Sequence, residues 1–293
     1  MIELKNVTKA FKSHKALDNV DMAINKGSVY GLLGSNGAGK STILRLLSGI
    51  YRQEGGEVLI EGKPVYDNVE LKQRIFFIND ETVQFTSYTL NDLKDLYKSY
   101  YPNFSEEIFE KLKTKINLPT NRKISTFSKG MKRQAIFIIA LACNTDYLLL
   151  DEAFDGLDPT MRIIVRQMLV DAMIERNLTV VISSHNLKEM NDLCDTVGLL
   201  HNGKIIFSSE LDNLKGDIHK LQLAFSDNTQ EITREQLEET GLEILHFEKN
   251  MSVYHIIVKG DIDTVKAAFA VKKPTIFDIV PLTLEEIFIY EME

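Results

Sequence analysis

The stretch GSNGAGKST at residues 34–42 constrains the fold of this chain more than any other part of the sequence. It follows SVYGLLG, which has the continuous apolar pattern of a strand buried on both faces, and it leads into STILRLLSGI, which has helical spacing. A glycine-rich loop between a buried strand and a helix is the context of a phosphate-binding P-loop. We therefore predict an α/β fold with a mostly parallel central sheet.

This loop has the residue types that hold phosphate. Its glycines allow backbone N–H groups to converge on phosphate oxygens, Lys40 can reach the β- and γ-phosphates, and the Ser41 hydroxyl can bind Mg²⁺. The sequence therefore predicts a site for a nucleoside triphosphate with Mg²⁺. The residues predicted to bind the nucleotide here are Gly34, Ser35, Asn36, Gly37, Ala38, Gly39, Lys40, Ser41 and Thr42.

Two acidic residues, Asp151 and Glu152, end the apolar stretch YLLLDE. Open α/β sheets bind their ligands at the carboxyl ends of the strands, so we expect both carboxylates to face the phosphates. Asp151 is predicted to hold the hydration shell of Mg²⁺, and Glu152 to polarise a water for attack on the γ-phosphorus. A strand that simply ends in solvated acids is the alternative interpretation.

His185 follows another apolar strand, in the stretch TVVISSH. A lone histidine is usually structural, but at this edge an imidazole can bond the γ-phosphate and orient Glu152. The candidate catalytic residues are therefore Lys40, Glu152 and His185. Asp158 precedes Pro159, which predicts an ordinary helix N-cap with proline at the first helical position.

The composition narrows the class of protein. The net charge of −8 argues against a general nucleic-acid binder, because such proteins present a basic face to the phosphates. Hydrophobic residues make up 44% of the chain, enough for a sizeable core, and the two cysteines lack metal-site spacing. No secretory signal is visible, and the longest apolar run, Ala135 to Cys143, is about half a membrane span. We expect a soluble protein that reaches a membrane only through a partner.

Two domains are expected, residues 1–215 and residues 216–293. Residues from about 84 to 143 have helical patterns, beginning with a Thr89/Asp92 capping box, and are predicted to form a helical subdomain of the first domain. In the second domain the order strand, helix, strand, strand, helix, strand predicts a small α+β domain of the β-α-β-β-α-β, or ferredoxin-like, type.

Taken together, these motifs resemble the ATP-binding subunits of ABC transporters over about residues 1–215. The P-loop, the strand YLLLDE, the loop FDGLD and the stretch SSH stand in that family's order and at its spacings. The resemblance implies ATP as the nucleotide and a P-loop ABC ATPase fold with an antiparallel β-subdomain. It implies a nucleotide contact from Asp158 in the FDGLD loop, and it places Phe11 where the family has an aromatic residue that stacks on adenine.

The stretch TFSKGMKRQ occupies the position of the family's signature motif. The resemblance implies that two chains pack head to tail, with each ATP between the P-loop of one chain and the signature of the other. Ser128 and Gly130, which would face the phosphate, are kept, whereas Lys129 replaces a glycine and could add charge toward ATP. A helix that starts here would stabilise a γ-phosphate through its N-terminus.

A second departure from the family pattern lies at Asp80, which aligns with the glutamine of the family's Q-loop. Asp80 could still reach Mg²⁺ through water, but as an anion rather than as an amide. The predicted metal ligands are therefore Ser41, Asp80 and Asp151.

The function implied by the resemblance is ATP hydrolysis that drives export through separate transmembrane permease subunits, with peptides or antimicrobial compounds as suggested cargo. The chain would work with a second ATPase subunit, identical or paralogous, on the inner face of the cell membrane. Tyr100, Tyr101 and Phe104 have two interpretations: they form helix core and loop, or they line the groove that receives a coupling helix of the membrane subunit.

Two other functions are weighed against this one. A soluble ABC-type ATPase acting on the ribosome usually carries two cassettes in one chain. One acting on DNA carries a long coiled coil where only about 45 residues, Glu81 to Ser125, stand here. A P-loop binding module without hydrolysis is disfavoured by Glu152 and His185.

Overall fold

The computed structural model describes residues 1–79, 87–211, 218–225, 232–270, 272, 274–280, 282–283 and 285–286. The chain divides into two compact units, Met1–Ser208 and Ser209–Glu293, called here the N-terminal and C-terminal units. The domain boundary expected between residues 215 and 216 lies in a segment outside the described residues.

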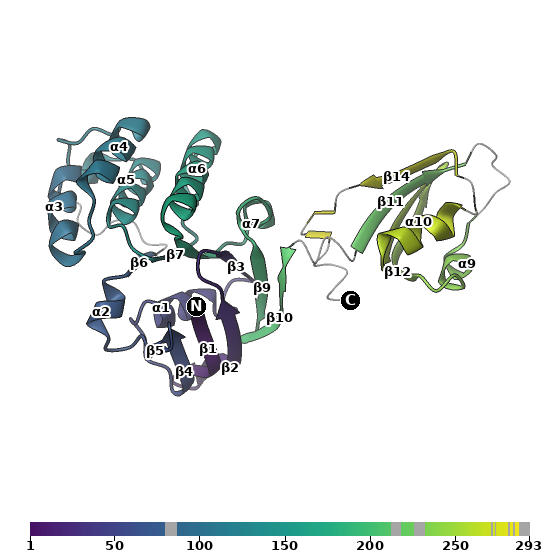
Figure 1. Ribbon diagram of the computed structural model, residues 1–293, viewed down its shortest axis with the longest axis horizontal. Helices are drawn as coiled ribbons and strands as arrows, with labels where there is room; N and C mark the ends of the chain where they lie inside the picture. Colours follow the sequence, from purple (N-terminus) through teal and green to yellow (C-terminus); the bar gives the residue numbers. More distant parts are fainter. Residues whose placement is uncertain are drawn as a thin grey trace. The chain divides into compact units, whose positions relative to one another are not determined.

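Six strands form the central sheet of the N-terminal unit: β3 (Val29–Leu33), β6 (Ile75–Ile78), β7 (Tyr147–Asp151), β8 (Thr179–Ser183), β9 (Thr196–His201) and β10 (Lys204–Glu210). Their order is β10-β9-β3-β8-β7-β6 (Figure 1). The pairs β3–β8, β3–β9, β7–β8 and β6–β7 are parallel, which confirms the predicted mostly parallel sheet. Because β3, β7 and β8 are parallel neighbours, their carboxyl ends meet at one edge.

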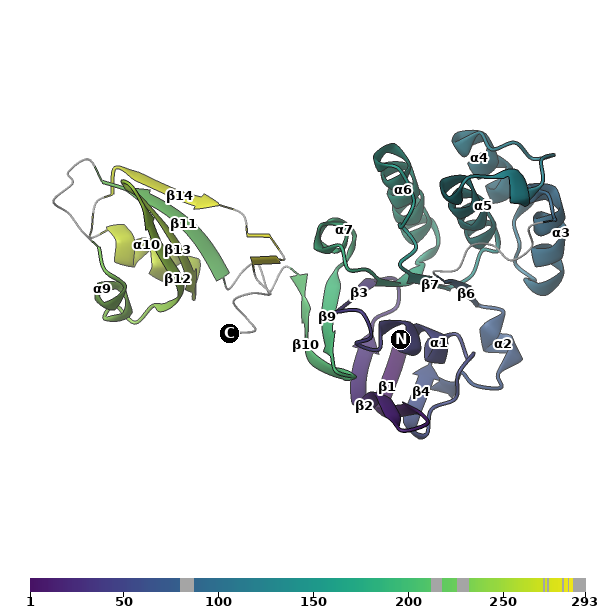
Figure 2. The ribbon, with the colours of Figure 1, turned by 180° about the vertical axis from the view of Figure 1, so that it is seen from behind.

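An antiparallel sheet accompanies the central one, in the order β2-β1-β4-β5. Its strands are β1 (Ile2–Phe11), β2 (His14–Ile24), β4 (Gly55–Ile60) and β5 (Lys63–Pro64), and helix α1 (Lys40–Leu47) lies beside β1 and β4 (Figure 2). The apolar face of α1 shares one core with Leu4 and Val58 of this sheet and with Tyr147 and Leu149 of the central sheet. The helix that follows the glycine-rich loop is therefore packed against both sheets, and this fixes where the loop ends.

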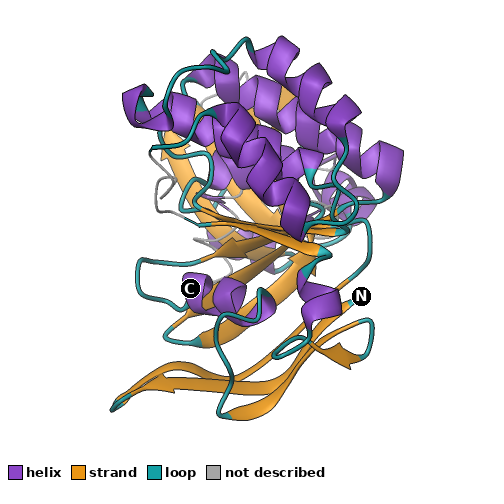
Figure 3. Ribbon diagram, turned by 90° about the vertical axis from the view of Figure 1, so that its left-hand side faces the viewer, coloured by secondary structure: helices purple, strands orange, loops and turns teal. Residues whose placement is uncertain are grey.

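The remaining helices of the N-terminal unit are α2 (Val69–Lys72), α3 (Leu90–Tyr100), α4 (Glu106–Ile116), the 3-10 helix η1 (Ile124–Thr126), α5 (Lys129–Ala142), α6 (Pro159–Arg176) and α7 (Leu187–Leu193). Helices α3, α4, α5 and α6 lie on the side of the central strands opposite to α1 and α2 (Figure 1), and Figure 3 shows helices gathered on one side of the strands in a view turned by 90°. Helices α3, α4 and α5 pack together in the stretch for which a helical subdomain is predicted. The predicted capping box is confirmed: Asp92 N donates to Thr89 Oγ1 at 3.2 Å, and Thr89 N donates to Asp92 Oδ2 at 2.8 Å.

Tyr100, Tyr101 and Phe104, for which the sequence left two interpretations, differ in their surroundings. The Tyr101 hydroxyl donates to the Ile75 carbonyl oxygen at 3.2 Å, and its ring packs on Phe76. Phe104 is half-buried against Phe109. Both therefore belong to the core and loop, whereas Tyr100 is 64% exposed and is available for contact with another molecule.

Glu61 ties the antiparallel sheet to the central one. Arg74 donates to both of its carboxylate oxygens at 2.9 Å, and the Tyr147 hydroxyl donates at 3.0 Å. The hydrogen bonds from Arg74 lower the pKa of Glu61 to about 2, against the burial that would raise it. A carboxylate whose pKa falls on folding stabilises the folded state above its unfolded pKa, so this contribution is lost as the pH falls from 4.5 to about 2.

We expect Glu61→Gln to lower the free energy of unfolding near neutral pH by about 1–2 kcal/mol, a value reduced for the partial exposure of the pair. The deficit relative to wild type should shrink as the pH falls from 4.5 to about 2, because the carboxylate of the unfolded wild-type chain is protonated in this range while that of the folded chain is still ionised. Urea unfolding over a pH series measures this, with Glu57→Gln on the same sheet as the control for simple loss of charge. A deficit that does not change with pH would contradict the assignment.

The C-terminal unit is a four-stranded antiparallel sheet with two helices. Its elements are β11 (Ile218–Ala224), α9 (Arg234–Glu238), β12 (Glu243–Asn250), β13 (Val253–Lys259), α10 (Ile262–Ala270) and β14 (Ile276–Val280). This is the β-α-β-β-α-β order expected from the sequence, and the strands lie in the order β12-β13-β11-β14. Alternating residues such as Leu221, Leu223, Tyr254 and Ile256 form its core. In β11 and β13 the residues that face this core are thus buried, as the period of two of a strand requires.

Candidate functional site

The glycine-rich loop has a backbone that needs glycine at two positions. Gly34 has a φ of 148°, and a Cβ there would lie 2.2 Å from the Leu200 carbonyl oxygen. Gly39 has a φ of 114°, and a Cβ there would lie 2.8 Å from the Ala16 carbonyl oxygen. The loop is therefore held closely between β2 and β9, in a conformation that L-residues with side chains rarely adopt.

Lys40 is the first residue of α1 and folds back over the loop. Its Nζ donates to the carbonyl oxygens of Gly34 at 2.7 Å and Ser35 at 3.1 Å, and the residue is only 5% exposed. Burial lowers the pKa of Lys40, while the nearby carboxylates of Glu152 and Asp151 act in the opposite direction. The loop thus holds a buried ammonium group in a place where an anionic ligand would relieve the cost of its desolvation.

Asp151 joins the P-loop helix to the end of β7. The hydroxyls of Ser41 and Ser183 donate to Asp151 Oδ1 at 3.1 Å and 2.6 Å. Asp151 is 1% exposed, and within the described residues its Oδ2 has no hydrogen-bond partner. An unsatisfied buried carboxylate oxygen is costly and is rare in folded proteins. Because Ser41 Oγ contacts the same carboxylate through Oδ1, the site offers a hydroxyl oxygen and a carboxylate oxygen, which are ligands suited to a hard cation.

Glu152 and His185 follow the carboxyl ends of the neighbouring strands β7 and β8. Glu152 Oε2 and His185 Nδ1 are 3.4 Å apart, and the His185 side chain is 57% exposed. Glu152 has a φ of 45°, which is costly for a residue with a side chain, and its N–H donates to the Ser183 carbonyl oxygen at 3.1 Å. Asp155 lies in the same cluster, with ligand atoms of all three residues within 4.8 Å of one another. The Glu152 carboxylate is therefore held in place by a strained backbone conformation.

The signature segment begins α5. Ser128 is the N-cap, and its Oγ accepts from Met131 N at 3.2 Å. The stem of Lys129 covers Gly156, and a Cβ added at Gly130 would lie 3.0 Å from the Gly156 carbonyl oxygen. The signature therefore packs in its own chain on the loop of residues 155–158.

Two other predicted contacts can be located. Asp158 is the N-cap of α6, as expected, and its Oδ1 accepts from Met161 N at 3.0 Å. Phe11 is 41% exposed and packs edge-on against Tyr51, with ring centroids 5.3 Å apart. The ammonium group of Lys9 also lies over the Phe11 ring, 5.2 Å from its centroid, and the adenine contact of Phe11 stays a prediction. Asp80 lies outside the described residues.

The structure thus brings Lys40, Ser41, Asp151, Glu152 and His185 to one edge of the sheet. Their chemical roles stay predictions. Sequence reasoning missed Ser183, because a serine at the end of a strand has no distinctive spacing. Within the described residues, no helix combines the length and the apolar character that crossing a membrane requires.

Known proteins with similar sequences are ABC transporter ATP-binding proteins. A family model described as ABC transporter matches residues 17–155. The ABC transporter ATP-binding protein YtrB of Bacillus subtilis strain 168 is 30% identical, over 99% of this chain and 97% of that protein. The bacitracin transport ATP-binding protein BcrA of Bacillus licheniformis is 31% identical, over 79% of this chain and 77% of that protein. The lantibiotic transport ATP-binding protein SrtF of Streptococcus pyogenes is 33% identical, over 72% and 92% respectively.

Solved structures share the fold. An ATP-binding subunit of an ABC transporter matches with a TM-score of 0.68 and 24% identity, covering 73% of this chain and 92% of that chain. An ATP-binding cassette solved as a dimer in a post-hydrolysis state, bound to ADP and Pi, matches with a TM-score of 0.64 and 24% identity. That match covers 72% of this chain and 99% of the other chain.

Proposed function

Because this chain belongs to the family of ABC transporter ATP-binding proteins, we propose that it is the ATP-hydrolysing subunit of a bacterial exporter. Two such subunits, identical or paralogous, enclose two ATP molecules and drive separate transmembrane subunits. The observation that carries this proposal is the meeting of Lys40 and Ser41 with Asp151, Glu152 and His185 at one sheet edge.

The P-loop binds the phosphates of ATP in this proposal. The ammonium group of Lys40 leaves its bonds to the carbonyl oxygens of Gly34 and Ser35 and pairs with the β- and γ-phosphates. The free N–H groups at the start of α1 add to this attraction, since a helix N-terminus carries partial positive charge. Phe11 stacks on the adenine ring.

Mg²⁺ is held by Ser41 and Asp151. The fit rests on the buried Asp151 Oδ2, which lacks a hydrogen-bond partner in the described part of the chain. Ser183 fixes the other carboxylate oxygen at 2.6 Å, so Oδ2 is aimed rather than free to rotate. Bound there, the ion supplies positive charge to the phosphate oxygens.

Glu152 is the general base. Its carboxylate accepts a proton from the water that attacks the γ-phosphorus, and a positioned base of this kind contributes roughly 10²- to 10⁴-fold to the rate. His185, 3.4 Å from Glu152, bonds the γ-phosphate and keeps the carboxylate in line. The strained φ of Glu152 fits this role, because strain is found where a side chain must point in one direction.

The signature binds the ATP of the other subunit. Ser128 and Gly130 stand at the start of α5, whose N-terminus can stabilise a γ-phosphate presented by a second chain. In such an arrangement ATP binds only the closed pair well, and its hydrolysis removes the ligand that joins the two subunits. Closing and opening therefore follow the nucleotide, and this motion is passed on to the membrane subunits.

Peptide antibiotics are the cargo that we propose. The support is indirect: BcrA is named for bacitracin transport and SrtF for lantibiotic transport. The exposed Tyr100 at the end of α3 is proposed to contact the membrane subunit, because aromatic side chains of this type dominate interface energies.

A strain that lacks this chain should become more sensitive to bacitracin and to a lantibiotic, and wild-type chain should restore resistance. Tyr100→Ala should fail to restore it while keeping ATPase activity, since losing a central interface aromatic weakens binding by roughly 2 kcal/mol, or about 30-fold. Ile174→Ala is the matched control, because Ile174 is 80% exposed on α6. Growth inhibition and phosphate release by the purified chain measure the two outcomes.

Three results would count against this proposal. A wild-type chain that binds ATP in Mg²⁺ without releasing phosphate is a binding module. Unchanged sensitivity to peptide antibiotics in the deleted strain removes the proposed cargo. Equal failure of Tyr100→Ala and Ile174→Ala removes the assigned contact.

A further inference from the structure

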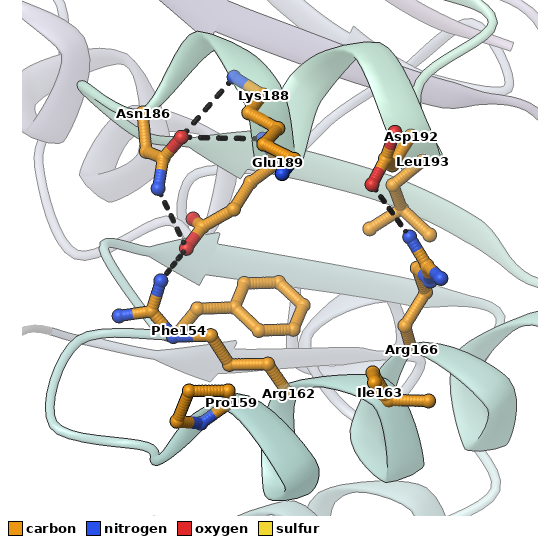
Figure 4. Close-up of a pocket in the computed structure, with 10 residues that line it drawn as sticks. All are labelled: Phe154, Pro159, Arg162, Ile163, Arg166, Asn186, Lys188, Glu189, Asp192 and Leu193. Atoms are coloured by element: carbon orange, nitrogen blue, oxygen red, sulfur yellow. Dashed lines mark hydrogen bonds and ion pairs between the residues drawn. The ribbon is translucent and has the colours of Figure 1, made fainter.

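Two ion pairs join α6 to α7 across a groove of about 340 Å³ (Figure 4). Arg162 Nη1 donates to Glu189 Oε1 at 2.6 Å, and Arg166 Nη1 donates to Asp192 Oδ2 at 2.8 Å. The two pairs lie on the same two helices and have nearly the same geometry. They differ in what else they touch, and this difference decides what each pair can do.

Glu189 holds the loop that carries His185. Its carboxylate accepts from Ser184 Oγ at 3.2 Å and from Asn186 Nδ2 at 3.2 Å, so it contacts the residues on both sides of the histidine. Asn186 N also donates to Ser184 Oγ at 2.9 Å, which closes this loop on itself. In the part of the chain that the structure describes, the polar contact recorded for His185 itself is the one with Glu152. The position of the imidazole therefore depends on its anchored neighbours.

Arg162 connects this anchor to a second loop. Its Nε donates to the Leu157 carbonyl oxygen at 3.1 Å, in the loop of residues 155–158. That same loop carries Gly156, which the stem of Lys129 covers. A continuous line of contacts thus runs from the signature, through the 155–158 loop and the Arg162–Glu189 pair, to the residues that flank His185. Among the described residues, the Arg166–Asp192 pair makes no hydrogen bond to either loop.

We propose that Arg162 and Glu189 are positioning residues that fix His185 relative to the 155–158 loop. The inference rests on the proposed function and deepens it, because it assigns two further residues to the geometry of hydrolysis. Neither residue touches ATP in this proposal. They act through the backbone of residues 184–186, and a shift of about 1 Å in a reacting group can lower a rate roughly 100-fold.

The groove makes this proposal testable with small substitutions. The pair borders open space, so shortening either side chain removes the bond without emptying a packed core. Charge-assisted hydrogen bonds such as these are stronger than neutral ones, and the Glu189 side chain is only 16% exposed. Water should therefore not replace the lost Arg162–Glu189 bond, and the loop of residues 184–186 should become less ordered.

The experiment compares Glu189→Ala and Arg162→Ala with the matched controls Asp192→Ala and Arg166→Ala in the full chain. Glu189→Ala and Arg162→Ala should lower kcat roughly 10- to 100-fold with the KM for ATP unchanged within about twofold. The two controls should keep kcat within about twofold of wild type. The double variant Arg162→Ala/Glu189→Ala should be no slower than the slower single one, because both substitutions break one line of contacts. Glu189→Gln, which still accepts hydrogen bonds, should recover part of the rate.

Amide hydrogen exchange of the nucleotide-free chain gives a second measurement that needs no hydrolysis. Exchange at residues 183–187 should rise in Glu189→Ala and Arg162→Ala and stay at the wild-type level in the controls. Equal effects of all four variants on kcat or on exchange would reduce the pair to ordinary helix packing and overturn the proposal. A rise in KM without a fall in kcat would overturn it as well. A wild-type chain without ATPase activity overturns the proposed function instead, while exchange still decides whether Glu189 and Arg162 anchor the loop.

Discussion

Glu152→Gln is expected to stop ATP turnover and to leave ATP binding intact. Glutamine has nearly the shape of glutamate and can keep the contact with His185 at 3.4 Å, but it cannot accept the proton of the attacking water. The expected loss of rate is roughly 10²- to 10⁴-fold. Because bound ATP is then not consumed, the two subunits should stay closed around it. Phosphate release measures the first effect, and light scattering at saturating ATP measures the second.

Asp155→Asn provides the control for this substitution. Asp155 lies in the same cluster as Glu152 and His185, so it tests whether any nearby acid serves as the base. We expect it to keep most of the wild-type rate, since Asp155 lacks the strained backbone that aims Glu152. If Asp155→Asn loses as much activity as Glu152→Gln, the general base has been misassigned. A Glu152→Gln chain that stays monomeric at saturating ATP would contradict the closed pair.

Mixing two inactive variants should restore activity if each ATP lies between two chains. Lys40→Ala removes the P-loop contact from its own site, and Ser128→Arg places a bulky cation at the start of α5, where the partner's nucleotide would bind. Each variant alone should be inactive. In an equal mixture, half of the pairs combine both chains and contain one intact site, so about a quarter of the wild-type sites should complete a single turnover.

The chain with both substitutions is the control for this mixing experiment. Lys40→Ala/Ser128→Arg supplies neither an intact P-loop nor an intact signature, so mixing it with either single variant should restore no ATP hydrolysis. Single-turnover hydrolysis is the measurement, because it counts intact sites even where the two sites of a pair depend on each other. Mixed pairs that form but recover no turnover would place Lys40 and Ser128 at one nucleotide within the same chain.

Several features of the site could be predicted because their interactions join residues that are close in the sequence. The N-caps Ser128 and Asp158 each bond an N–H three residues ahead, at Met131 and Met161. The P-loop needs only the order of strand, glycines, lysine and helix. The two acids at the end of β7 could be assigned to the ligand edge because the apolar stretch before them has the pattern of a buried parallel strand.

Other features could not be predicted, because they join residues that are far apart in the sequence. Ser183 meets Asp151 only because β7 and β8 are neighbours in register, with Asp151 opposite Ser183. Arg162 and Glu189 meet only because α6 and α7 pack side by side. Tyr101 and Tyr100 are adjacent in an aromatic stretch, yet one bonds the Ile75 carbonyl oxygen and the other is exposed. Tyr100 is the last residue of α3 and Tyr101 follows it in an extended backbone, so the packing at this helix end separates them.

The sequence by itself therefore determined the phosphate loop, the acids and histidine at strand ends, the helix caps and the order of elements in both units. These depend on local backbone preferences and on the period of the hydrophobic pattern, which neighbouring residues set. Only the tertiary structure decided the strand order β10-β9-β3-β8-β7-β6, the serine that aims Asp151, the positive φ of Glu152 and the contacts that anchor the His185 loop. Each of these is the result of long-range packing, in which the partner of a residue depends on the whole chain.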